Sequence, residues 1–279
     1  MKKIIAAIDG LKFSDSTRDF AVDIARRINA HLVGVFLDDE TYTSYKVYDL
    51  VVQEGAPEAR LKKFDAQDKE TRSKAAINFA NACRKAELTY ALHHNRGIAI
   101  HELIHESIYA DLLVIDAKET LTHYEEKQPT RFIRDLLSDV QCPVLLVPKK
   151  FKPVEKIVLL YDGEPSSVFA ARMFSYLFGF FGEVETEVLS VKNVNQSLHL
   201  PDNKLMKEFM KRHFPGAGYK VLKGIAEVEI TEYLKTQKQN LLIVLGAYRR
   251  GRVSRWFRQS MADVLMKELK APLFIAHNK

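Results

Sequence analysis

The sequence predicts an α/β protein made of two tandem domains, each an open five-stranded, mainly parallel sheet with helices on both faces. Two observations support this prediction. The segment KIIAAIDG at residues 3–10 returns as KIVLLYDG at residues 156–163, which is 153 positions later. In both halves, short apolar runs alternate with amphipathic stretches, a pattern typical of parallel strands joined by crossover helices.

The length of the repeat indicates a duplicated domain. A period of 153 residues is far longer than the unit of a solenoid, so we interpret the chain as two copies of one globular domain, residues 1–150 and residues 151–279. The duplication also supplies an internal comparison. A residue that serves a function of both copies should occur in both of them.

The first domain is predicted to alternate five strands with four helices. The predicted strands are residues 4–8, 31–37, 90–94, 112–116 and 144–147. The predicted helices are one with Ala21, Ile24, Ala25 and Ile28 on its apolar face, followed by residues 65–85, 100–109 and 132–138. Ser16 has the spacing of a residue that caps the first helix. Residues 40–65 show no clear period and include Gly55-Ala-Pro57, so we expect a loop or an irregular excursion there.

The second domain repeats this order of elements. Its predicted strands are residues 157–161, 186–191, 219–222, 241–245 and 273–277. Its predicted helices are one with Phe169, Met173, Phe174 and Leu177 on its apolar face, followed by residues 204–213, 228–235 and 260–269. Two shorter matches support the alignment of the copies: Gly97-Ile-Ala with Gly224-Ile-Ala, and Cys142-Pro-Val with Ala271-Pro-Leu.

Composition favours a folded cytoplasmic protein. The chain has 47% hydrophobic residues, enough for two cores, but no run approaches the ~20 apolar residues that span a bilayer, and Asp9 interrupts the first apolar run too early for a signal peptide. Cys83 and Cys142 lie far apart, which suits a reducing compartment and disfavours a disulfide framework. The net charge of +6 is modest, so the composition predicts neither membrane nor nucleic-acid binding.

The topology predicts where a ligand should bind. In doubly wound sheets, ligands bind beyond the carboxyl ends of the strands, where the strand order reverses. The loops to examine therefore follow the first and fourth strand of each copy. They contain Asp9 and Asp116 in the first copy, and Asp162 and Gly246 in the second.

These residues resemble the universal stress protein family in its tandem form. The resemblance rests on the two opening strands that end in Asp-Gly, the run Leu242-Ile-Val-Leu-Gly246-Ala, and the closing Ala271-Pro-Leu-Phe-Ile strand, and it covers nearly the whole chain apart from residues 40–65. It implies flavodoxin-like (adenine nucleotide alpha hydrolase-like) domains. It also implies that the two fifth strands, residues 144–147 and 273–277, pair edge to edge as an intramolecular pseudo-dimer, to which a further homodimer is a possible addition.

The nucleotide-binding branch of that family has a Gly-x2-Gly-x9-Gly-Ser/Thr loop after the fourth strand, and its first-strand aspartate lies beside the adenine and ribose. In the second copy the corresponding residues are Gly246, Arg249, Gln259 and Ser260, with Asp162 as the aspartate. Two of the three glycines are absent, and a Cβ hinders the approach of backbone to phosphate, although an arginine can supply charged donors instead. The resemblance implies that ATP, the one cofactor suggested, binds to the second domain weakly or not at all.

The first copy departs further from this pattern. Asp116 stands where Gly246 stands, no glycine follows it in the loop, and Thr130 alone resembles the terminal hydroxyl residue. A carboxylate facing a phosphate repels it. We therefore expect the first domain not to bind ATP.

One motif suggests a metal. His101-Glu102-Leu-Ile-His105 matches HExxH, in which two histidines one helical turn apart bind zinc and the glutamate acts as a base. The corresponding stretch of the second copy, residues 228–232, has neither histidine. The sequence therefore predicts no metal site. Adventitious zinc binding at His101 and His105, with His93 or His94, is the alternative, and it is favoured over metalloprotease activity.

An arginine cluster is the one strongly basic segment. Five arginines lie between Arg249 and Arg258, beside Trp256. Three interpretations remain open: a solvated, partly ion-paired surface, an anion site for a phosphate ligand, or a contact with nucleic acid or an acidic partner.

No catalytic constellation occurs in both copies. This disfavours an enzyme, and the family resemblance implies a stress-associated binding or signalling module that acts with a protein partner. The alternatives are an enzyme that hydrolyses ATP slowly with Asp162, Gly246 and Ser260, and a zinc hydrolase that uses His101 and His105.

Overall fold

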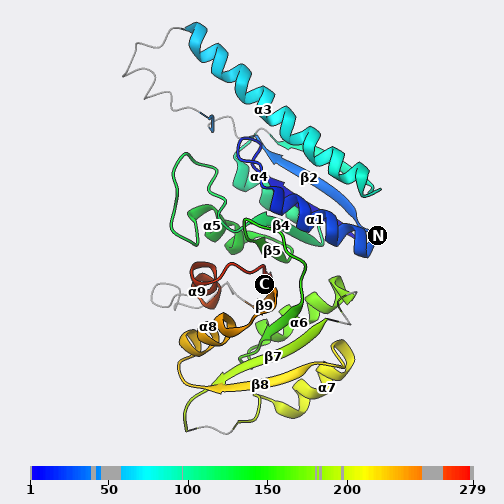
Figure 1. Cartoon of the computed structure of the whole chain (residues 1–279), viewed down its shortest axis with the longest axis vertical. Coiled ribbons are helices and arrows are strands. Elements are labelled where there is room, and N and C mark those ends of the chain that lie inside the picture. Colours follow the sequence, from blue (N-terminus) through cyan, green and yellow to red (C-terminus); the bar gives the residue numbers. More distant parts are fainter. Residues whose placement is uncertain are drawn as a thin grey trace.

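The strands of the chain form one continuous sheet (Figure 1). The computed structural model describes residues 2–38, 42–44, 58–95, 97–179, 181, 184–195, 198–246 and 260–276. The strands are β1 (Lys3–Ile8), β2 (His31–Leu37), β3 (Tyr90–Asn95), β4 (Leu112–Asp116), β5 (Val144–Val147), β6 (Lys156–Leu160), β7 (Glu185–Lys192), β8 (Gly218–Lys223), β9 (Leu241–Gly246) and β10 (Leu273–Ala276). The helices are α1 (Asp15–Ile28), α3 (Glu58–Lys85), α4 (Ala99–Ser107), α5 (Arg131–Asp139), α6 (Pro165–Leu177), α7 (Asn203–His213), α8 (Ala226–Thr236) and α9 (Met261–Glu268).

The two halves of the sheet repeat one strand order. The full order is β3-β2-β1-β4-β5-β10-β9-β6-β7-β8. In each half the order of the strands therefore reverses between the first and the fourth strand. All pairs within a half are parallel, as predicted. At the centre, β5 pairs with β10 in antiparallel register, with Phe274 opposite Leu145. The predicted pairing of the fifth strands is therefore confirmed for residues up to 276.

Helices cover both faces of the sheet. Side chains from α1, α3, α6 and α7 form one buried cluster with one face of the strands, and side chains from α4, α5, α8 and α9 form a second cluster with the other face. The central strands β5, β10 and β6 are buried along their whole length, because both of their faces meet helices. This explains why these strands appear in the sequence as continuous apolar runs.

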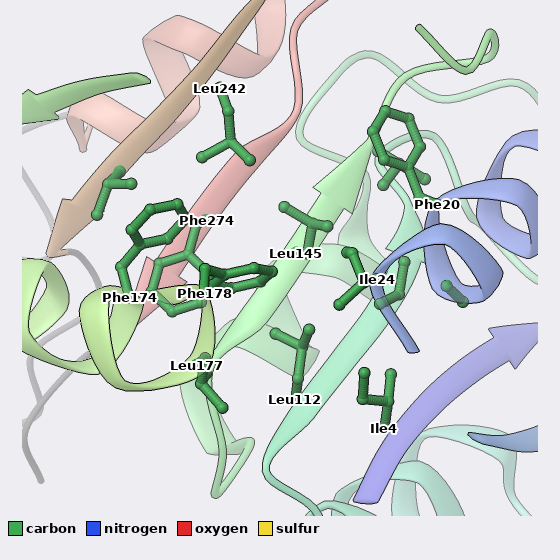
Figure 2. Packing of buried hydrophobic residues seen from close by; sticks show 14 of the residues in the cluster. Ile4, Phe20, Ile24, Leu112, Leu145, Phe174, Leu177, Phe178, Leu242 and Phe274 are labelled. Atoms are coloured by element: carbon green, nitrogen blue, oxygen red, sulfur yellow. The ribbon is translucent and has the colours of Figure 1, made fainter. Parts of the chain in front are cut away.

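Aromatic side chains join the two halves at the seam between β5 and β10. The Phe174 ring on α6 lies 4.7 Å from the Phe178 ring and 5.2 Å from the Phe274 ring on β10. Leu145 on β5 faces the same cluster from the first half (Figure 2). All four side chains are at most 2% exposed, so the seam is part of a shared core.

The structure corrects two predicted helix starts. Helix α1 begins at Asp15, and its cap is Ser14, whose hydroxyl accepts a hydrogen bond from the Thr17 N–H at 3.3 Å; Ser16 lies inside the helix. Ser14 is favoured because its hydroxyl also donates to the Asp116 carboxylate at 3.0 Å, a contact that local spacing does not reveal.

The second correction concerns the predicted excursion over residues 40–65. Helix α3 begins at Glu58, so residues 58–64 are helical, while residues 39–41 and 45–57 lie outside the described residues. The N-terminal end of α3 projects beyond the sheet in Figure 1 and is mostly exposed. A helix with no core to face carries no strong apolar period, which is why the sequence pattern missed this part. No helix in the described ranges has the length and apolar character needed to cross a membrane.

Candidate functional site

Three of the five residues predicted to bind a nucleotide are described. Asp162 lies two residues beyond the end of β6, Gly246 ends the adjacent strand β9, and Ser260 precedes α9. All three therefore belong to the carboxyl end of the sheet, where the strand order reverses. Arg249 and Gln259 lie outside the described residues, as does the whole arginine cluster between Arg249 and Arg258.

A cavity of about 480 Å³ opens beside Asp162. Neither Gly246 nor Ser260 lines it. It is lined by Asp162, Val191, Lys192, Asn193, Pro201, Gly224, Ile225 and Ala226. Apart from Asp162, these residues were not predicted as site residues, although the repeat of Gly-Ile-Ala at positions 97 and 224 was a sequence signal that pointed to this segment.

The lining of the cavity combines groups that suit a nucleotide. The exposed Asp162 carboxylate is an acceptor for sugar hydroxyls, and Lys192 supplies a positive charge. Helix α8 begins here at Ala226 and no side chain caps it, so its first backbone N–H groups favour an anion, whereas Glu227 and Glu229 in its first turn oppose one. The site has the chemistry to bind an anionic ligand that carries hydroxyl groups.

Gly246 is explained by packing. A Cβ at this position would lie 2.4 Å from the backbone carbonyl carbon and oxygen of Ser166 and 2.8 Å from the Ser167 nitrogen. The end of β9 thus touches the start of α6 so closely that only glycine fits. This close packing explains why residue 246 is a glycine, and no contact with a phosphate is needed to explain it.

Ser260 also has a structural role. Its hydroxyl accepts a hydrogen bond from the Asp263 N–H at 3.2 Å and caps α9. In the first half, Thr130 caps α5 in the same way, through the Ile133 N–H at 3.2 Å. The hydroxyl therefore serves the helix start in both halves.

The two aspartates that follow the first strand of each half differ in exposure. Asp9 is 2% exposed, and its Oδ1 accepts hydrogen bonds from the Leu11 N–H at 2.8 Å and the Lys12 N–H at 3.1 Å. Asp162 is exposed and accepts one from the Glu164 N–H at 2.9 Å. Both residues therefore cap the turn that follows their strand. The other oxygen of Asp9, Oδ2, has no hydrogen-bond partner in the described part of the chain.

Side chains of the first half fill the region that is open in the second. Tyr42 is 5% exposed and Glu119 is 9% exposed. The Tyr42 ring lies 5.5 Å from the His123 ring and 5.3 Å from the Lys12 ammonium, while its carbonyl accepts a hydrogen bond from Arg72 at 2.7 Å. Tyr42 is thus held from three sides.

The electrostatics of this filled site oppose an anion. Burial, and next the Asp9 carboxyl, raise the pKa of Glu119 to about 7. Burial likewise raises the pKa of Asp9, and burial and Asp9 raise the pKa of the Tyr42 phenol. Asp116 adds a further carboxylate at the end of β4. A phosphate group would meet three acidic side chains here, two of them buried.

Replacing Glu119 with glutamine should remove a pH dependence of stability. The ordinary glutamate pKa is 4.5 and the folded value is about 7, so between these pH values the folded protein holds a proton that the unfolded chain releases. The proton on Glu119 therefore stabilises the folded protein fully below about pH 4, and this contribution is lost as the pH rises through about 7. As the pH rises from about 5 to about 8, we expect the free energy of unfolding of E119Q to increase by on the order of 3 kcal/mol relative to that of the wild type.

Urea unfolding at both pH values measures this difference. The control is Glu125→Gln, an exposed glutamate of the same loop, which should follow the wild type at both pH values. A difference between E119Q and the wild type that stays constant with pH would contradict the expected protonation.

The HExxH motif does not assemble a metal site within the described residues. His101 and His105 are exposed on α4, and among the residues that the structure describes no group of three His, Cys, Asp or Glu side chains is placed to hold a metal ion. The Nδ1 atom of His93 is hydrogen-bonded to the Glu106 carboxylate, and the Nδ1 atom of His94 is hydrogen-bonded to the Asp38 carboxylate.

The glutamate of the motif has a structural explanation instead. The Glu102 carboxylate lies against Gly97, where its Oε1 would be 2.6 Å from an added Cβ. In the second half, the Glu229 Oε1 would lie 2.5 Å from a Cβ added to Gly224. The same glycine and glutamate contact therefore occurs at the start of α4 and α8, with histidines in only one of them.

Comparison with known proteins places this geometry in context. The model of a family described as the universal stress protein family matches residues 1–148. The crystal structure of a universal stress protein from Archaeoglobus fulgidus DSM 4304 is similar over 99% of this chain and 98% of that chain, with 13% identity and a TM-score of 0.72. The structure of the functionally unknown protein PA1789 from Pseudomonas aeruginosa PAO1 is similar over 99% and 92%, with 14% identity and a TM-score of 0.59. The comparison with curated proteins gave no match. At these identities the structural likeness concerns the fold.

Proposed function

The chain belongs to the universal stress protein family, and we propose that it is a tandem member, with domains at residues 1–150 and 151–279, that works as a binding or signalling module. In this proposal the second domain binds an adenine nucleotide weakly, and the first domain binds none. The protein acts through what it binds and does not turn over a substrate.

The single observation that carries the proposal is the contrast between equivalent positions of the two halves. Beyond β6 there is a cavity of about 480 Å³ with Asp162 and Lys192 in its lining. Beyond β1, by contrast, Asp9, Tyr42 and Glu119 are each at most 9% exposed. A fold that offers the same site twice thus retains an open site in one half.

The chemistry of the open site supports weak binding. One lysine favours a phosphate, and the Asp162 carboxylate suits ribose hydroxyls, while Glu227 and Glu229 in the first turn of α8 offset the attraction of that helix start. Gly246 and Ser260 are engaged in packing and capping, so they add little to a phosphate cradle. An affinity in the range of about 0.1 to 1 mM matches so few contacts.

Calorimetric titration of the full chain with Mg-ATP tests the proposal. We expect one site per chain, and we expect Asp162→Ala and Lys192→Ala each to weaken binding by about fivefold or more, because each removes a polar group of the lining. The matched control is Asp9→Asn, the equivalent aspartate of the first half, which should leave the affinity unchanged.

Three results would contradict the proposal. Two sites per chain would place a nucleotide in the first half as well, and the absence of any heat of binding would remove the nucleotide from both. Steady release of phosphate from ATP, lost in the Asp162→Ala variant, would make the protein an enzyme.

A further inference from the structure

The second half ends in an open strand edge. Strand β8 is the last strand of the ten-stranded order, so within the part of the chain that the structure describes it pairs with β7 on one side only (Figure 1). Its first three residues, Gly218 to Lys220, are exposed. The backbone N–H and C=O groups on the outer side of such a strand are available to pair with another extended chain.

This edge carries most of the net charge of the protein. Residues 192–223 contain seven lysine and arginine residues and two acidic residues, a net charge of +5, while the whole chain has +6. Six of these cations are exposed, and none of them forms an ion pair with the described part of the chain. They are Lys204, Lys207, Lys211, Arg212, Lys220 and Lys223.

The cations lie on both sides of the strand. The Lys207 ammonium of α7 lies 5.9 Å from the centre of the Tyr219 ring, and the Lys220 ammonium lies 5.9 Å from the Tyr233 ring of α8. Val221 and Leu222 follow Lys220 in β8; they are half-buried and pack into the clusters on opposite faces of the sheet. A strand added beside β8 would therefore meet positive charge and some apolar surface on each face.

The opposite edge of the sheet differs. Strand β3 is the equivalent edge of the first half, and its two histidines contact carboxylates of neighbouring segments. His93 contacts Glu106 at 2.6 Å, and His94 contacts Asp38 at 2.9 Å. Unpaired positive charge is thus a property of the β8 edge and not of edge strands throughout this fold.

We propose that the β8 edge binds an acidic, extended segment of a partner protein, which adds to the sheet as a further strand. The segment borders the nucleotide cavity, since Lys192 lines that cavity and β8 ends next to Gly224, but none of the six exposed cations lines it. The inference does not depend on nucleotide binding. A second copy of the chain is disfavoured as the occupant, because two β8 edges would bring lysines face to face. Nucleic acid would match the charge, but it makes no use of an unpaired β-strand backbone.

A defined peptide tests the proposal. The probe is a fluorescent, acetylated peptide of about ten residues in which glutamate alternates with valine, matched to the two faces of the edge. Its twin carries N-methyl groups on four consecutive central residues, which removes backbone donors without changing charge. We expect the twin to bind at least about tenfold more weakly, and we expect the probe to slow hydrogen exchange of β8 amides.

Charge-reversal variants complete the experiment. The triple variant K207E/K220E/K223E should weaken binding of the probe by about tenfold or more, whereas K63E/K69E/K85E, with the same change in net charge on exposed positions of α3, should change it by less than about threefold. The proposal is overturned by absence of probe binding, by equal binding of the N-methylated twin, or by a short DNA duplex that binds more tightly and displaces the probe. Self-association that protects the β8 amides without any peptide would assign the edge to a second copy instead.

Discussion

Replacing Phe174 with alanine should lower the free energy of unfolding by about 4 kcal/mol, because it removes a fully buried aromatic side chain from a packed cluster. The Phe174 ring stacks on Phe178 and meets the edge of Phe274, next to the β5 and β10 pairing (Figure 2). The alanine would leave a cavity at the place where the halves share a core.

Thermal and urea unfolding measure this effect, and the same helix provides the control. Tyr176 is also aromatic and lies two residues away, but it is 60% exposed. Tyr176→Ala should cost less than about 1 kcal/mol. Equal losses in the two variants would show that the aromatic cluster contributes no more than an exposed ring.

Replacing Gly246 with alanine should also destabilise the protein strongly, by about 3 kcal/mol, in the absence of any ligand. The added methyl group would lie 2.4 Å from the Ser166 backbone, so the end of β9 and the start of α6 must move apart. This result would assign the glycine to packing. If the glycine existed to admit a phosphate, the variant would lose nucleotide affinity and keep its stability.

Gly216→Ala is the control for this prediction. No atom lies within 4 Å of a Cβ added to Gly216, so that variant should retain the stability of the wild type within about 1 kcal/mol. Circular dichroism during thermal unfolding compares the two variants directly. Equal melting temperatures for the two would contradict the close approach at Gly246.

The order of elements was predictable because each core strand is buried on both faces. A run such as residues 241–245 must be apolar throughout, and the repeated Asp-Gly after the first strand marks the same turn twice. Helix ends were less predictable. The cap of α1 depends on Asp116, which lies 102 residues from Ser14 in sequence, so local spacing selected Ser16 instead.

The candidate site was predicted only in part. The rule that ligands bind where the strand order reverses led to Asp162, which does line the cavity. Lys192 and residues 224–226 were missed because the rule selects only the loops after the first and fourth strands. Lys192 ends β7, the second strand of that half, and residues 224–226 follow β8, the third. The family motif, conversely, drew attention to Gly246 and Ser260, whose contacts are with the protein itself.

The sequence by itself determined the class of fold and the repeated order of elements, because these follow from local apolar patterns that recur at a fixed offset. The pairing of the fifth strands was an implication of the family resemblance, and the structure shows it. Only the tertiary structure decided which of two similar sites is open. Asp9 and Asp162 begin the same motif, but Tyr42 and Glu119 bury the first and nothing equivalent among the described residues covers the second. Side chains far apart in sequence make that difference, since burial is a property of what packs together in space and not of spacing along the chain.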